Sequence, residues 1–134
     1  MKNKRDLRPL FEPRSIAVVG ASSNPNRTGG RPIRLLLEYG FDGPVYPINP
    51  NRDEIGELKC YPDITSLPET PEFVLFCTPR EQNAVILREC AARGVKAAAI
   101  MSSGYAEVDG EGESLQSELL GIANEADMIL LGPN

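Results

Sequence analysis

The sequence predicts an α/β fold: a Rossmann-like, doubly wound and mostly parallel five-stranded sheet with helices on both faces. Short apolar runs of strand length recur along the chain, and segments with apolar residues at helical spacing separate them. Runs that are apolar throughout are typical of strands covered on both faces. Strands that alternate with helices pair in parallel through right-handed crossovers.

The five expected strands follow one another in chain order. The first spans residues 15–20, and the others span 45–49, 72–78, 96–102 and 127–132. The first four end in small or conformationally special residues, in the stretches "GASSN", "NPN", "CTP" and "SSG". Because the carboxyl ends of parallel strands lie on one rim of the sheet, we expect these four loops to converge on one crevice.

Three helices are expected between the strands. In the first, Pro32 suits the opening turn and Gly40 can end the helix with a positive φ. Its apolar face is expected to contain Ile33, Leu36 and Leu37. The apolar faces of the other two helices consist of Ala84, Leu87 and Ala91 before Gly94, and of Leu115, Leu119, Ile122 and Ala126.

Residues 53–71 depart from this alternation. Gly56, Pro62, Pro68 and Pro71 favour turns with at most a short helix, so this segment is expected to replace a crossover helix by a looser connection.

Length and composition indicate an ordinary globular protein. The 134 residues are expected to form a single domain, 1–134, with 41% hydrophobic and 25% charged residues. The sequence stops at "GPN" directly after the last expected strand. We interpret this as a domain excised from a larger protein. No run of apolar residues is long enough for a bilayer and no secretory signal is present, so we expect a cytoplasmic location and no membrane contact.

Several kinds of chemistry are disfavoured by the composition. The chain has no histidine, which removes the commonest general base and most zinc sites. The three cysteines lack metal-ligand spacing and are expected to be free thiols in packed positions. The net charge of −5 argues against nucleic acid as a partner. We therefore expect neither catalytic residues nor a metal site in this chain.

The stretch "SIAVVGASSNPNRTGG" predicts a phosphate site. Gly20 allows a sharp turn after the first strand, and Ser22 and Ser23 can donate hydroxyl hydrogen bonds. The backbone amides near Gly29 and Gly30 are expected to open the next helix toward an anion, where the helix dipole favours negative charge.

The identity of the phosphate compound stays open on these residues alone. The dinucleotide fingerprint GxGxxG is absent, and "NPNR" stands where a dehydrogenase places an acidic residue for the NAD ribose. Arg52 in this loop suits a phosphorylated ribose instead. Two adenosine compounds carry one: NADP, with a 2′-phosphate, and coenzyme A, with a 3′-phosphate.

A family resemblance favours coenzyme A. The stretches "FEPRSIAVVGASSNP", "VYPINPN", "IGELKCYPDITSLPE", "GVKAAAIMSSGYAE" and "LLGPN" occur in this order over nearly the whole chain. Together they resemble the CoA-binding domain of NDP-forming acyl-CoA synthetases, which are relatives of the succinyl-CoA synthetase α subunit. The resemblance implies an N-terminal module that binds CoA or acyl-CoA, catalyses nothing alone and works with further synthetase domains in an ADP- or GDP-forming acid–CoA ligase.

The resemblance also implies the residues that contact CoA, all in the loops that follow the first four strands. The loop after the first strand would face the phosphates, the second would approach the nucleotide end, the third would flank the cofactor and the fourth would lie near the pantetheine arm. In that order the residues are Gly20, Ser22, Ser23 and Asn24; Pro50, Asn51 and Arg52; Thr78 and Pro79; Met101, Ser102 and Ser103. Ser103 stands where the succinyl enzyme has a glutamate.

Two other functions remain as alternatives at this point. One is an NADP-binding Rossmann oxidoreductase domain. The other is a regulatory or interaction module, such as the N-terminal part of a protein acetyltransferase. The sequence leaves the acyl group, the choice of ADP or GDP and any homo-oligomer undetermined.

Overall fold

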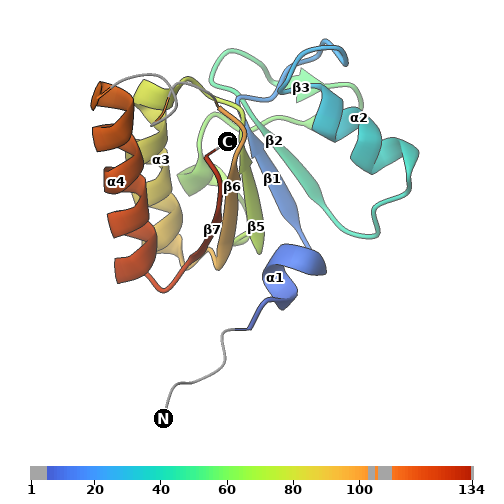
Figure 1. Ribbon diagram of the computed structural model, residues 1–134. Coiled ribbons are helices and arrows are strands. Elements are labelled where there is room, and N and C mark those ends of the chain that lie inside the picture. Colours follow the sequence, from blue (N-terminus) through green and yellow to red (C-terminus); the bar gives the residue numbers. More distant parts are fainter. Residues whose placement is uncertain (1–5, 103–104, 106–109, 134) are drawn as a thin grey trace.

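A five-stranded parallel sheet forms the centre of the protein (Figure 1). The computed structural model describes residues 6–102, 105 and 110–133. The strands lie in the order β2-β1-β5-β6-β7. Their bounds are Ile16–Val19 for β1, Val45–Ile48 for β2, Phe73–Phe76 for β5, Ala97–Ile100 for β6 and Ile129–Leu131 for β7. The predicted fold class and all five predicted strands are confirmed.

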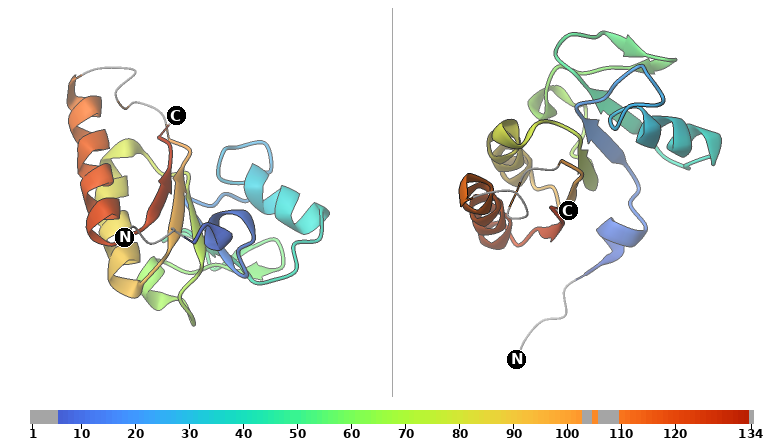
Figure 2. Two further views of the ribbon diagram at one scale, coloured as in Figure 1. Left: turned by 60° about the horizontal axis from the view of Figure 1, so that its bottom comes forward. Right: turned by 45° about the horizontal axis from the view of Figure 1, so that its top comes forward.

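Helices cover both faces of the sheet. α3 (Arg80–Arg93) and α4 (Gly110–Glu125) pack side by side on one face, as both views of Figure 2 show. The short 3₁₀ helix η1 (Ile64–Ser66) lies against α3. α2 (Arg31–Glu38) covers the opposite face over β1 and β2, and the one-turn helix α1 (Arg8–Phe11) precedes β1.

The two faces of the sheet bury separate clusters of side chains. Ala17 and Val19 of β1 pack with α3 and α4, whereas Ile16 and Val18 pack with Ile33 of α2. All four residues of β1 are buried, as expected for a central strand. Within the described residues, no helix is long and apolar enough to cross a bilayer.

The connections produce a topological switch between β1 and β5. From β1 the chain passes through α2 to β2 at one edge, and it then returns past β1 to β5. The covering helix changes face at this point, from α2 to α3 (Figure 1). Ligands of open α/β sheets bind outside the carboxyl ends of the strands at such a switch. The fold therefore directs attention to the carboxyl ends of β1 and β5.

The predicted ends of the helices agree with the structure. The predicted apolar face of α2 agrees only in part. Gly40 and Gly94 have φ of 71° and 88°, as predicted for residues that end helices. Ile33 is only 4% exposed, but Leu37 is 52% exposed. The prediction that Leu37 shares the covered face is wrong, because α2 packs on the sheet only through the side that carries Ile33 and Leu36.

The segment 53–71 holds a small hairpin that the sequence analysis did not predict. β3 (Glu54–Ile55) pairs antiparallel with β4 (Leu58–Lys59), and Gly56 in the turn has a φ of 61°. η1 follows, and the Asp63 carboxylate accepts a hydrogen bond from the Ser66 amide at 2.9 Å. No crossover helix stands between β2 and β5, which confirms the looser connection expected there.

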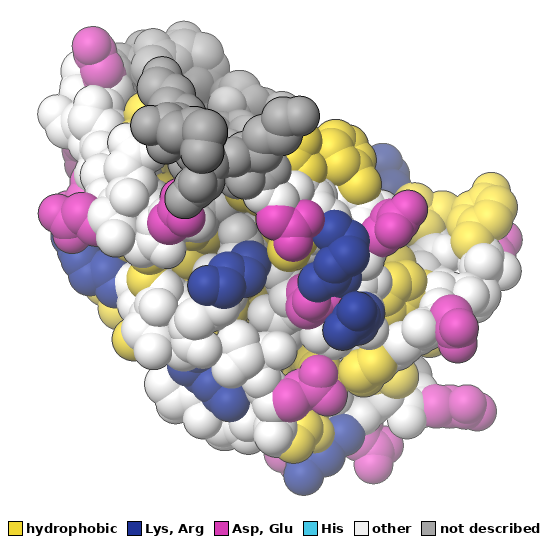
Figure 3. Space-filling view, turned by 90° about the horizontal axis from the view of Figure 1, so that it is seen from below, with side chains coloured by type: hydrophobic (Ala, Val, Ile, Leu, Met, Phe, Trp, Pro, Cys, Tyr) yellow, Lys and Arg dark blue, Asp and Glu magenta, His cyan; other side chains and the backbone are white. Residues whose placement is uncertain are grey.

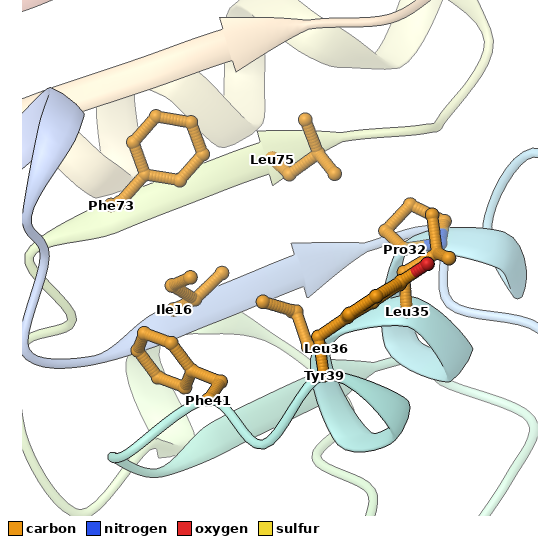
Figure 4. A pocket seen from close by; sticks show the side chains of 8 residues that line it. All are labelled: Ile16, Pro32, Leu35, Leu36, Tyr39, Phe41, Phe73 and Leu75. Atoms are coloured by element: carbon orange, nitrogen blue, oxygen red, sulfur yellow. The ribbon is translucent and has the colours of Figure 1, made fainter.

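The α2 face leaves part of the sheet accessible. A groove of about 440 Å³ lies between α2 and the strands β1 and β5 (Figure 4). The side chains that line it are apolar except for the Tyr39 hydroxyl: Ile16, Pro32, Leu35, Leu36, Tyr39, Phe41, Phe73 and Leu75. We refer to it as the apolar groove. The face at the amino ends of the strands, shown in Figure 3, differs from the apolar groove in its charge. Basic and acidic side chains are interspersed on it.

Candidate ligand-binding crevice

The carboxyl edge of the sheet carries three adjoining hollows. The loop hollow is lined by Gly20, Ala21, Ser22, Asn26, Arg27, Thr28, Gly29, Asn49 and Cys77. The η1 hollow, of about 340 Å³, is lined by Val19, Gly20, Ile48, Asn49, Pro50, Asn51, Pro62, Asp63, Ile64, Thr78, Gln82, Ile86 and Glu89. The outer hollow is lined by Thr28, Cys77, Thr78, Pro79, Arg80, Met101 and Ser102.

These hollows form one continuous crevice. Gly20 and Asn49 line both the loop hollow and the η1 hollow. Thr28 and Cys77 line both the loop hollow and the outer hollow, and Thr78 lines the η1 and outer hollows. The crevice therefore crosses the switch point between β1 and β5, where the topology places a ligand.

The turn at Gly20 is required by the neighbouring strand. Gly20 has a φ of 80°, and a β-carbon there would lie 2.8 Å from both the carbonyl carbon and the oxygen of Cys77. The Gly20 and Ala21 amides each donate to the Ile48 carbonyl at 3.1 Å. Only glycine fits this backbone, because other residues rarely adopt such a φ and the space beside β5 is filled.

The loop after β1 is held by its own hydrogen bonds. The Ser22 hydroxyl accepts from the Asn24 amide at 3.1 Å, and the Asn24 side chain accepts from the Asn26 amide at 3.0 Å. The Gly30 amide donates to the Arg27 carbonyl at 3.0 Å. It is therefore occupied within the loop, and the expectation that this amide opens toward an anion is wrong.

The glycine pair instead allows close backbone packing. A β-carbon on Gly29 would lie 2.0 Å from the Gly20 oxygen, and one on Gly30 would lie 1.9 Å from the Asn24 oxygen. The loop thus folds back on itself with Ser22 and Thr28 on its inner side, where both line the loop hollow.

Asn49 joins the loops after β1 and β2. Its side-chain amide donates to the Ala21 carbonyl at 2.9 Å, and its side-chain oxygen accepts from the Asn51 amide at 2.8 Å. Pro50 and Asn51 line the η1 hollow. Arg52 follows Asn51 in the chain, is exposed, and is not among the residues that line the three hollows.

A buried asparagine joins the loops after β5 and β6. Asn83 of α3 is 0% exposed, and its side-chain oxygen accepts from the Thr78 hydroxyl at 2.5 Å. Its side-chain nitrogen donates to the Ser102 hydroxyl at 3.1 Å and to the Tyr105 hydroxyl at 2.7 Å. The Ser102 hydroxyl in turn donates to the Thr78 carbonyl. Thr78 and Ser102 are thereby fixed at the outer hollow.

Two arginines line the crevice, and the carboxylates of Asp63 and Glu89 line its η1 hollow. Arg27 lines the loop hollow, and among the described residues no carboxylate pairs with it. Arg80 lines the outer hollow, and its guanidinium lies 3.1 Å from a Glu81 oxygen and 3.7 Å from a Glu111 oxygen. Arg27 is therefore the better placed of the two to meet an anion in the described crevice.

The cysteine in the crevice is a packed thiol. Cys77 lies in the loop and outer hollows, and its sulfur donates to the Thr28 carbonyl at 3.5 Å. Burial raises the pKa of this thiol to about 11. Cys60 and Cys90 are buried free thiols as well, and burial raises the pKa of both. A protonated thiol is a poor nucleophile, in agreement with the predicted packing role.

The structure brings together most of the predicted contact residues. Those that line the crevice are Gly20, Ser22, Pro50, Asn51, Thr78, Pro79, Met101 and Ser102. Ser23, Asn24 and Arg52 are exposed and do not line it. Ser103 lies outside the described residues.

Several lining residues were missed by the sequence analysis. Arg27, Thr28 and Asn49 are the most prominent, and each lies within or beside a quoted motif. A basic residue between the first strand and the glycine pair was a usable signal for Arg27. Ile64 and Ile86 reach the η1 hollow from separate elements, which no local pattern could have indicated.

Comparison with known proteins identifies the class of this domain. Residues 14–134 match the family model described as CoA binding domain. The chain therefore belongs to the CoA-binding domain family, and the predicted resemblance is confirmed.

Relatives of known activity carry the same domain within longer chains. The chain is 40% identical over 129 residues to acetate–CoA ligase [ADP-forming] II of Archaeoglobus fulgidus, covering 96% of this chain and 19% of the ligase. It is 35% identical to the α subunit of acetate–CoA ligase [ADP-forming] I of Pyrococcus furiosus, covering 96% of this chain and 29% of that subunit. These matches favour the CoA interpretation over the NADP and regulatory alternatives.

A solved structure supports the same assignment. The dinucleotide-forming acetyl-coenzyme A synthetase 1 of Ca. Korarchaeum cryptofilum, in complex with phosphate and ADP, superposes with a TM-score of 0.91 at 42% identity. The alignment covers 98% of this chain and 28% of that one. The chain thus spans less than a third of each of these relatives.

Proposed function

We propose that the chain is one CoA-binding domain of an ADP-forming acid–CoA ligase and that CoA lies along the crevice. The observation that carries this proposal is that three hollows of different character adjoin one another at the switch point. One presents three isoleucines, one presents hydroxyls and an arginine that pairs with no carboxylate among the described residues, and one is of mixed character. CoA has three parts of matching character: adenosine 3′-phosphate, pyrophosphate and pantetheine.

The η1 hollow suits the adenine ring. Ile48, Ile64 and Ile86 present apolar surface from β2, η1 and α3, between which a flat ring can be buried. Gln82 and Glu89 line the same hollow and offer oxygens to the adenine amino group. Arg52 follows Asn51 in the chain, and we propose that it reaches the 3′-phosphate from there.

The loop hollow suits the pyrophosphate. The hydroxyls of Ser22 and Thr28 and the guanidinium of Arg27 all line it. Ser23 and Asn24, which were predicted to face the phosphates, are exposed on the loop beside them. Charge-assisted hydrogen bonds from arginine to phosphate oxygens are stronger than neutral ones, so Arg27 would dominate this part of the site.

The outer hollow suits the pantetheine arm. Pro79 and the 43% exposed Met101 provide apolar contact, while Thr78 and Ser102 provide polar groups. We propose that other domains of such a ligase bind the acid substrate. Those domains would also carry out the steps that involve the phosphoryl group and the nucleotide. The relatives' names support ADP over GDP for the whole enzyme.

Calorimetric titration of the chain with CoA, 3′-dephospho-CoA and NADPH tests this proposal. We expect CoA to bind with a micromolar dissociation constant, dephospho-CoA to bind more weakly and NADPH not to compete. Binding of NADPH in preference to CoA, or binding of neither nucleotide, would overturn it.

A further inference from the structure

We infer that Asn83 is a positioning residue that sets the hydrogen-bond polarity of the outer hollow, so that Thr78 and Ser102 accept hydrogen bonds from the amide N–H groups of pantetheine. This inference rests on the proposed function. Asn83 is fully buried on α3 and reaches both loops at the carboxyl ends of β5 and β6.

The direction of each hydrogen bond follows from one carbonyl. The Thr78 carbonyl can only accept, so the Ser102 hydroxyl must give its single hydrogen to it. The Asn83 atom beside Ser102 is then necessarily the donating nitrogen, as observed. Its oxygen consequently faces Thr78, whose hydroxyl hydrogen is donated to it.

The hydroxyls of Thr78 and Ser102 therefore both donate their hydrogen atoms to acceptors within the protein. What Thr78 and Ser102 still offer to the crevice is lone pairs, and lone pairs attract donors and repel phosphate oxygens. Pantetheine carries two amide N–H donors, whereas the pyrophosphate carries only acceptors. The Asn83 network thus suits the pantetheine end of CoA and directs the phosphates toward Arg27 and the loop hollow.

Asn83 also has no spare hydrogen bond to give up. Its nitrogen donates to both Ser102 and Tyr105. Among the described residues, no buried side-chain nitrogen or oxygen lacks a partner. The isosteric change Asn83→Asp replaces both donors by an acceptor, so Ser102 must turn its hydrogen away from the Thr78 carbonyl and the polarity of the outer hollow is disrupted.

The test compares two ligands that share adenosine, the 3′-phosphate and the first 5′-phosphate, and only CoA carries the second 5′-phosphate and pantetheine. CoA contains pantetheine, and adenosine 3′,5′-bisphosphate does not. For the parent chain we expect CoA to bind more tightly than the bisphosphate. For Asn83→Asp and for Ser102→Ala we expect the dissociation constant of CoA to rise about fivefold or more, while that of the bisphosphate stays within about twofold. Asn124→Asp, at an exposed position on α4, is the matched charge control and should change neither.

Each outcome bears on a different statement. If the variants weaken both ligands equally, or neither, Asn83 is only structural and the inference fails. If Asn83→Asp does not fold by far-UV circular dichroism, Ser102→Ala decides alone by the same criterion. Equal affinity of the parent chain for both ligands overturns the inference and leaves the adenosine end of the proposed site intact. Failure of the parent chain to bind CoA overturns the proposed function itself.

Discussion

The crevice and the apolar groove both lie against β1 and β5, but they are built from different chemistry. The crevice uses glycine turns, hydroxyls, side-chain amides and two arginines at the carboxyl ends of the strands. The groove uses aliphatic and aromatic side chains from the strands and α2 (Figure 4). Its lining contains no charged group, so it offers no charged side chain to a phosphate.

The difference shows which property of the chain each region depends on. The crevice depends on backbone conformation, because Gly20, Gly29 and Gly30 allow approaches that any β-carbon would block. The groove depends on side-chain volume, because Leu36 and Phe41 pack against the cluster around Ile16. Substitutions in one region should therefore leave the other intact, and the following predictions test this separation.

The largest effect on stability and CoA binding is expected at Gly20, where both backbone conformation and side-chain volume are restricted. Gly20→Val forces a β-branched residue to a φ of 80° and places its β-carbon 2.8 Å from the Cys77 backbone. Backbone strain and overpacking together should lower the free energy of unfolding by about 3 kcal/mol. CoA binding should be lost with it. Urea denaturation and calorimetry on the same preparation measure both.

Gly121→Ala is the matched glycine control. Gly121 lies in α4, and a β-carbon there would have no atom within 4 Å apart from its chain neighbours and the nearby backbone of its own helix. This change should raise stability by up to about 1 kcal/mol, because alanine favours the helix, and leave CoA affinity unchanged. If Gly20→Val is as stable as the parent chain, the closeness of the Cys77 backbone does not explain why glycine occupies position 20.

The next effect is expected in binding alone. Arg27→Ala should weaken CoA by about 1.5–3 kcal/mol, the range for a hydrogen bond to a charged group, and should weaken dephospho-CoA equally. Arg52→Ala should weaken CoA more than dephospho-CoA, because only CoA carries the 3′-phosphate. Calorimetric titration of both ligands gives the two ratios.

Arg34→Ala is the control for these arginines, since Arg34 lies on α2 and pairs with Glu38 at 3.2 Å. It should alter neither affinity. An Arg27→Ala chain that binds CoA like the parent chain would remove the pyrophosphate from the loop hollow.

These arginines also show how much of the site could be predicted from the sequence. Apolar runs predicted the strands because each buried strand leaves a continuous local pattern, and the strand order of a Rossmann-like sheet then placed the crevice. The two-residue strands of the hairpin are too short to leave such a pattern. Arg52 was expected in the site because of its place after the second strand. In the structure the Arg52 amide donates to the Asn49 carbonyl at 3.4 Å, and the exposed Arg52 is not among the residues that line the crevice, so its contact with the 3′-phosphate stays a prediction.

Contacts between elements that are distant in the sequence could not be predicted for a different reason. Asn83 is in the sequence one polar residue near the start of a helix, and its partners Ser102 and Tyr105 come 19 and 22 residues later. Only the packing of α3 on the sheet brings them together. The sequence analysis singled out the Gly29–Gly30 pair for its amides, whereas the structure shows that both glycines allow close backbone packing and that the Gly30 amide is bonded within the loop.

A smaller effect is expected from the groove. Leu36→Ala removes a partly buried side chain from the cluster around Ile16 and should lower the free energy of unfolding by about 1–2 kcal/mol, less than a fully buried leucine would. The affinity for CoA should not change. Urea denaturation and calorimetry again measure both quantities. A marked loss of CoA affinity in a folded Leu36→Ala chain would break the separation between the groove and the crevice.

The smallest effect concerns the carboxylate at the amino end of β5. Glu72 directly precedes Phe73 of the groove, and its oxygens accept from the Arg8 guanidinium at 3.0 and 2.5 Å and from the Arg14 amide at 2.7 Å. The hydrogen bond from Arg8 is the main cause that lowers the pKa of Glu72 from 4.5 to about 2. Since the pair is partly exposed, solvent screening reduces its contribution to stability.

A carboxylate with a lowered pKa in the folded state stabilises the protein above its unfolded pKa, and that stability is lost as the pH falls toward the folded value. The free energy of unfolding of the parent chain should therefore decrease between pH 4.5 and about 2. In Glu72→Gln this decrease should be shallower, whereas Glu57→Gln, at the exposed hairpin turn, should follow the parent chain. At neutral pH, Glu72→Gln should bind CoA like the parent chain, because the pair lies at the edge of the sheet opposite the crevice. Parallel pH profiles for Glu72→Gln and the parent chain would show that the Arg8–Glu72 pair contributes nothing to holding this end of the fold.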